Sequence, residues 1–204
     1  MSSREEGEAL YGRMAGRPEH EDFWRLSTLV VERDRRVDSV PASAKEAVFV
    51  DEISRFIDID VLRGFAEDRA LRLLGVKLGG RVTPRVDELA RYASVYVDAF
   101  VQGAEYNSLH GPHGGPAGTG ERDKARPMND ERIGHHVDPA SLRYLAQQRS
   151  YRLLGLVTVA DAQRRQRDVE RLSLLYVGAF VEGAEYNEAY GPPGERHEVP
   201  PEGA

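Results

Sequence analysis

The sequence of 204 residues contains no cysteine, which excludes disulfides, thiolate metal ligands, iron–sulfur clusters and cysteine nucleophiles. No apolar run approaches the roughly 18 residues that a membrane-spanning helix needs. The first ten residues, MSSREEGEAL, lack the basic and then apolar order of a signal peptide. We therefore expect a cytoplasmic protein with no membrane segment.

Catalytic signatures are also missing. The sequence has no Gly-x-Ser-x-Gly, no Walker phosphate loop and no Gly-x-Gly-x-x-Gly. With 34 acidic and 28 basic side chains, its net charge of -6 disfavours general binding to nucleic acid, which depends on neutralising phosphates. These observations predict a protein that is not an enzyme and has no cofactor or metal.

The strongest signal in the chain is an internal duplication. A shift of 80 residues aligns 62–112 with 142–192 without a gap, and 22 of the 51 aligned pairs are identical. The densest identity lies between 96 and 107, and it closes with Gly-Ala-Glu-Tyr-Asn in both copies. One unit has been copied in tandem, and shared packing explains the retained residues more simply than a paired functional site.

Each copy has the pattern of a helical hairpin. Asp58 and Asp138 are suitable N-caps for a first helix that we expect to reach about residue 77 or 158. Second helices are expected from about 84 to 110 and from about 161 to 190, each followed by Gly-Pro. Two further helices are expected upstream, after residues 19–22 and over about 44–57, although 48–50 could instead form a short strand.

The predicted fold is therefore all-α, with two tandem helical hairpins that pack about a pseudo-twofold axis as a bundle. The expected organisation is a flexible N-terminus (1–18), a helical segment (19–57), repeat 1 (58–112), a Gly/Pro-rich linker (113–133), repeat 2 (134–192) and a flexible tail (193–204).

The second helix of each copy carries a broad apolar seam, which suits packing against more than one neighbour. The seam and the repeated polar residues beside it predict where the copies pack or interact: Tyr96, Phe100, Gly103, Glu105 and Asn107, with Tyr176, Phe180, Gly183, Glu185 and Asn187. The glycines would let another helix approach closely. We expect the two asparagines to contact one another.

Repeated charges suggest specific pairs. In an antiparallel hairpin, Glu105 would lie within reach of Arg63, and Glu185 within reach of Arg143. Four other repeated arginines lie one helical turn apart in each copy: Arg69, Arg72, Arg149 and Arg152. Guanidinium groups that converge there would suit a small anionic ligand, whereas the simpler interpretation is that they bind nearby carboxylates.

Histidines flank the linker, at positions 110, 113, 135 and 136. Their spacing fits no standard metal site, so a solvated loop is the simpler interpretation. Two functions follow from the sequence. The first is a structural or protein-interaction protein that forms a homo-oligomer or binds a protein partner, and the alternative is a sensor of a nucleotide or phosphorylated metabolite.

Overall fold

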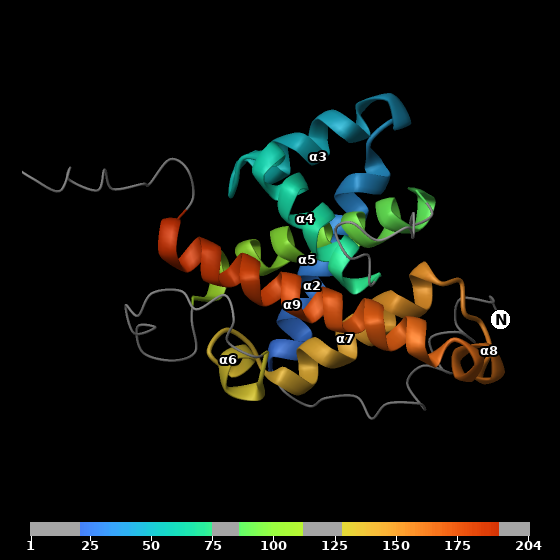
Figure 1. The fold of residues 1–204 in the computed structure, drawn as a ribbon. Coiled ribbons are helices and arrows are strands. Elements are labelled where there is room, and N and C mark those ends of the chain that lie inside the picture. Colours follow the sequence, from blue (N-terminus) through green and yellow to red (C-terminus); the bar gives the residue numbers. More distant parts are fainter. Residues whose placement is uncertain (1–20, 75–85, 112–127, 192–204) are drawn as a thin grey trace, which may run out of the picture.

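The computed structural model describes residues 21–74, 86–111 and 128–191, and within these ranges all regular structure is helical (Figure 1). The elements are α2 (Glu21–Ser39), the 3-10 helix η1 (Ala42–Ala44), α3 (Lys45–Ser54), α4 (Ile59–Leu73), α5 (Val86–His110), α6 (Asp130–Gly134), α7 (Pro139–Leu153), α8 (Val159–Arg164) and α9 (Gln166–Tyr190). The all-α prediction is confirmed for these residues. The segments expected to be flexible at 1–18 and 193–204, and most of the linker, lie outside them.

The first helix of each hairpin starts at the predicted cap. The Asp58 carboxylate accepts from the backbone N–H groups of Asp60 and Val61, and the Asp138 carboxylate accepts from that of Ser141. Both helices end earlier than expected, at Leu73 and Leu153. In the second copy the reason is local, because Gly155 adopts a φ of 62°, which glycine accommodates at little cost.

The second helices end as predicted but begin differently in the second copy. Thr158, expected to end the preceding helix, instead caps the short α8 by accepting from the N–H of Asp161. Asp161 therefore lies within α8, and α9 begins only at Gln166 after a break at Arg165. Gly111 and Gly191 terminate α5 and α9 with φ values of 68° and 61°.

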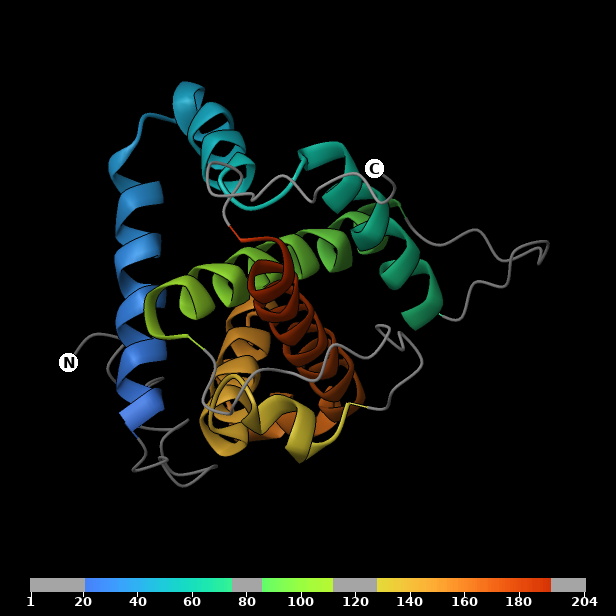
Figure 2. The same cartoon turned by 90° about the vertical axis from the view of Figure 1, so that its left-hand side faces the viewer.

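The long helices α5 and α9 cross at the centre of the molecule (Figure 2). Helix α4 packs on α5, α7 packs on α9, and α2 lies beside both α7 and α5. The core contains the seam aromatics Tyr96, Phe100, Tyr176 and Phe180, each at most 2% exposed. Among the described helices, none combines the length and the apolar character needed to cross a membrane.

Candidate functional site

The crossing of α5 and α9 is built on two glycines. A Cβ atom placed on Gly103 would lie 1.9 Å from the carbonyl oxygen of Phe180, and one placed on Gly183 would lie 1.9 Å from that of Phe100. Both helix backbones therefore touch without intervening side chains. The ring of Tyr106 lies 5.7 Å from that of Phe180 and closes one side of the crossing.

Polar side chains at the crossing bond to the opposite long helix. The Tyr96 hydroxyl donates to Glu182 at 2.5 Å, and the Tyr176 hydroxyl donates to Gln102. Burial and the Glu182 carboxylate together raise the pKa of Tyr96 above its ordinary value. Gln102 and Glu182 occupy matched positions in the two copies, yet they escaped the sequence analysis because they differ within a run of identities.

Two of the four repeated arginines are engaged by carboxylates from other helices. Arg69 pairs with Glu182, and Arg149 bonds Asp34 of α2 at 3.1 Å and Asp98 of α5 at 3.4 Å. Arg72 pairs with Asp68 one turn away. The anionic-ligand hypothesis for these arginines stays a prediction.

The expected partners of the repeated glutamates were wrong. Glu185 binds Arg132 of α6 through two bonds of 2.7 Å, and Arg143 pairs with Asp130. Glu105 pairs at 3.2 Å with Arg36 of α2, which also lies 3.4 Å from Glu52.

The physical reason lies in one matched position. Residue 132 is Arg in the second copy, whereas its counterpart, residue 52, is Glu. Arg132 can therefore bind Glu185 directly, but Glu52 and Glu105 would repel one another. The arginine of α2 lies between them and binds both carboxylates.

The predicted contact between Asn107 and Asn187 is not a hydrogen bond. Both side chains are buried, and neither amide oxygen has a hydrogen-bond partner among the described residues. A bond between the two amides would have satisfied one of those oxygens.

A buried carboxylate that the sequence did not reveal ties α2 to both copies. Asp22 is fully buried, accepts from the Tyr106 hydroxyl at 2.7 Å and accepts from the backbone N–H of Asp138 at 2.6 Å. In the sequence it belonged to an acidic run before a helix, which is typical of a solvated helix start.

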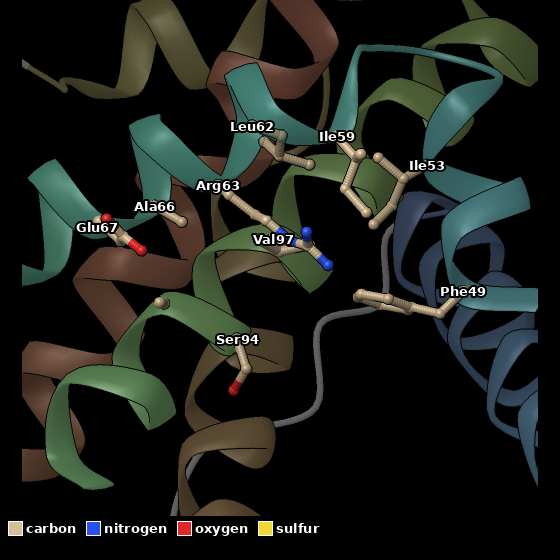
Figure 3. A pocket seen from close by; sticks show the side chains of 10 residues that line it. Phe49, Ile53, Ile59, Leu62, Arg63, Ala66, Glu67, Ser94 and Val97 are labelled. Carbon is tan, nitrogen blue, oxygen red and sulfur yellow. The ribbon is translucent and has the colours of Figure 1, made fainter. Parts of the chain in front are cut away.

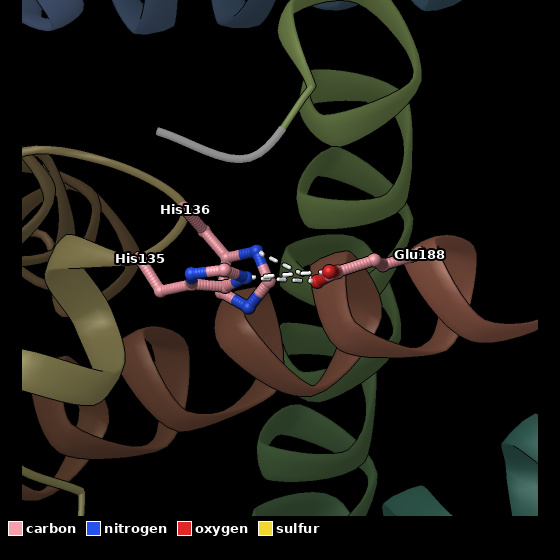
Figure 4. A group of neighbouring side chains, drawn as sticks. All are labelled: His135, His136 and Glu188. Carbon is pink, nitrogen blue, oxygen red and sulfur yellow. Dashed lines mark hydrogen bonds and ion pairs between the residues drawn. The ribbon is translucent and has the colours of Figure 1, made fainter. Parts of the chain in front are cut away.

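Two histidines and a glutamate lie together where α6 leads into α7. His135 and His136 follow α6, and both rings face the carboxylate of Glu188 on α9 (Figure 4). The Nε2 atom of His135 lies 3.2 Å from the nearer carboxylate oxygen, and Nδ1 of His136 lies 3.8 Å from it. Burial, together with the neighbouring His135, lowers the pKa of His136 to about 4.

An apolar pocket of about 180 Å³ opens between α3, α4 and α5 (Figure 3). Phe49, Ile53 and Leu62 form part of its wall, and Arg63 and Glu67 of α4 line it as well. Beside it, Val61 and Phe65 are exposed on the outer face of α4.

Comparisons with known proteins assign no relative to this chain: no family model matches the sequence, and no curated protein or solved structure shows significant similarity to it.

Proposed function

We propose that the protein is a non-enzymatic interaction protein that self-associates, built from two duplicated hairpins related by a pseudo-twofold axis. The helix bounds support the duplication, since α7 and α9 each begin and end 80 residues after α4 and α5. The reciprocal contacts of Gly103 with Phe180 and of Gly183 with Phe100 support the axis.

The observation that carries the proposal is a difference between the two copies. On α7, Ser141 is fully buried and Leu145 is 8% exposed, on the helix that α2 packs against. On α4, the matched residues Val61 and Phe65 are 46% and 39% exposed. The first copy therefore leaves open a helix face that the second copy covers.

That covering contact shows what the open face can accommodate. The ring of Phe23 on α2 lies 5.5 Å from the ring of Tyr144 on α7, in an edge-on packing. The residue matched to Tyr144 is Gly64, and a side chain there would meet no atom within 4 Å. A helix could approach α4 closely at this point.

We assign the open face to a second copy of the same chain, with α4 packed antiparallel on its twofold-related equivalent. Such an interface is self-complementary, because each residue meets the same surface from the other side. Arg63 and Glu67 are one turn apart and both exposed at the pocket. A twofold axis between them would place each arginine against the partner's glutamate.

The test is the mass of the protein in solution. Light scattering coupled to size-exclusion chromatography should give a dimer for the wild type and a monomer for Phe65→Ser, with helical circular dichroism retained. Leu174→Ser is the matched control, since Leu174 on α9 is 69% exposed and lies away from the pocket lining. It should remain dimeric.

The charge pair gives a second arm. Arg63→Glu alone should weaken the dimer, and Arg63→Glu combined with Glu67→Arg should restore it. A wild type that is monomeric at high micromolar concentration, or a dimer that Phe65→Ser leaves unchanged, would show that α4 is not a self-association surface.

A further inference from the structure

The cluster of His135, His136 and Glu188 has the dimensions of a metal site. One ligand atom from each residue can be chosen so that all lie within 4.8 Å of one another. Metal–ligand bonds of about 2.0–2.2 Å in tetrahedral geometry separate ligand atoms by about 3.3–3.6 Å. The two measured nitrogen–oxygen distances, 3.2 and 3.8 Å, are close to that range.

A second, independent feature is the state of His136. Its side chain is 1% exposed, and its Nδ1 atom has no hydrogen-bond partner among the described residues. The 3.8 Å to Glu188 is too long for a hydrogen bond. A buried polar atom without a partner costs free energy, and this one faces a carboxylate across a gap that a cation would bridge (Figure 4).

We propose that His135, His136 and Glu188 bind one divalent transition-metal ion of the zinc class. Two imidazoles and one carboxylate suit Zn²⁺ or a related borderline ion, whereas Ca²⁺ and Mg²⁺ prefer oxygen ligands alone. The low basicity of His136 keeps its ring neutral at neutral pH, which is the form that binds metals. Three protein ligands leave a fourth position for water or another group.

The ion would fasten the turn between α6 and α7 to the last turns of α9. The first copy offers no equivalent site, because Arg55, Phe56 and Ser108 occupy the matched positions. The expected stoichiometry is therefore one ion per chain. This inference is independent of the proposed self-association, because all three ligands belong to one chain.

Calorimetric titration of the chelator-treated full-length protein with Zn²⁺ provides the test. The wild type should bind one ion per chain, and Glu188→Gln should weaken binding roughly 100-fold or more, since loss of a second-shell partner alone costs about 10–100-fold. Glu170→Gln, which removes an exposed carboxylate from the same helix, is the matched control and should bind like the wild type.

Two further measurements guard against a folding defect in the variants. His135→Gln alters a partly exposed residue and should lose binding while keeping the wild-type circular dichroism. Co²⁺ should give visible d–d absorption bands of a four-coordinate site in the wild type, and His136→Gln should lose them.

Two results would overturn the proposal. One is the absence of stoichiometric Zn²⁺ binding by the wild type. The other is binding that Glu188→Gln and His135→Gln both leave unchanged, which would assign the ion to other side chains of the chain.

Discussion

At Gly103 and Gly183, one hydrogen atom in place of a methyl group allows α5 and α9 to meet. Gly183→Ala places a Cβ against the backbone oxygen of Phe100, which no side-chain rotation can relieve. We expect a loss of unfolding free energy of about 2–3 kcal/mol or more, as for overpacking in a rigid core. Urea unfolding followed by circular dichroism measures it.

The same helix provides the control. Gly178 has nothing within 4 Å of its Cβ position, so Gly178→Ala should stabilise the protein by about 0.5–1 kcal/mol through helix propensity. Equal effects of the two substitutions, in either direction, would contradict the close crossing.

Tyr106 and Tyr186 are matched in sequence, but only Tyr106 bonds a buried carboxylate. Tyr106→Phe should cost about 1–3 kcal/mol, because it removes one donor from the fully buried Asp22. Tyr186→Phe should cost less than about 0.5 kcal/mol, as expected for a substitution that breaks no buried bond. Thermal and urea unfolding of the two variants side by side give the comparison, and a reversed order would remove the assigned role of Asp22.

Residue-level pairs were the least predictable part of the structure. The sequence identified Glu105 and Glu185 as polar groups retained in both copies, but their partners depend on elements outside the aligned hairpins. Arg36 comes from α2 and Arg132 from α6, and both lie before the segment in which the copies align. The His135, His136 and Glu188 cluster escaped for the same reason, since its third member is 52 residues further along the chain.

Helix ends were more predictable than residue pairs, because caps and stops are local chemistry. Asp58, Asp138, Gly111 and Gly191 act as the sequence predicted. The break between α8 and α9 was missed, since apolar periodicity does not reveal where a short capped turn replaces a continuous helix.

The two caps should differ in their contribution to stability. Asp138 accepts from both the backbone and the hydroxyl of Ser141, which is fully buried, whereas the bonds of Asp58 are exposed. Asp138→Ala should therefore cost about 2 kcal/mol and Asp58→Ala about 0.5–1 kcal/mol. Asp60→Ala, in the first turn of α4, should be nearly neutral. Chemical denaturation of the three variants tests the order, and a larger cost for Asp58→Ala would contradict it.

Over the whole molecule, α2 joins the two copies. Its Asp22 bonds Tyr106 of α5 and the backbone of Asp138, and its Asp34 bonds Arg149 of α7. Arg33, 2% exposed, reaches Asp98 of α5 and Glu52 of α3. These contacts span more than 60 residues of sequence in most cases, so no local pattern revealed them. They imply that the two copies unfold together.

Cooperative unfolding can be tested with the single tryptophan, Trp24, which lies on α2. Trp24 fluorescence reports on α2, while far-ultraviolet circular dichroism reports on all the helices. In urea the two signals should change with one midpoint, as in a two-state transition. Leu26→Ala, at a residue that is 1% exposed, should cost about 2–5 kcal/mol and move both midpoints equally. If α2 were only attached to the surface, Leu26→Ala would lower the fluorescence midpoint alone. The circular dichroism transition would then persist at its original urea concentration, because α5 and α9 would keep their crossing without α2.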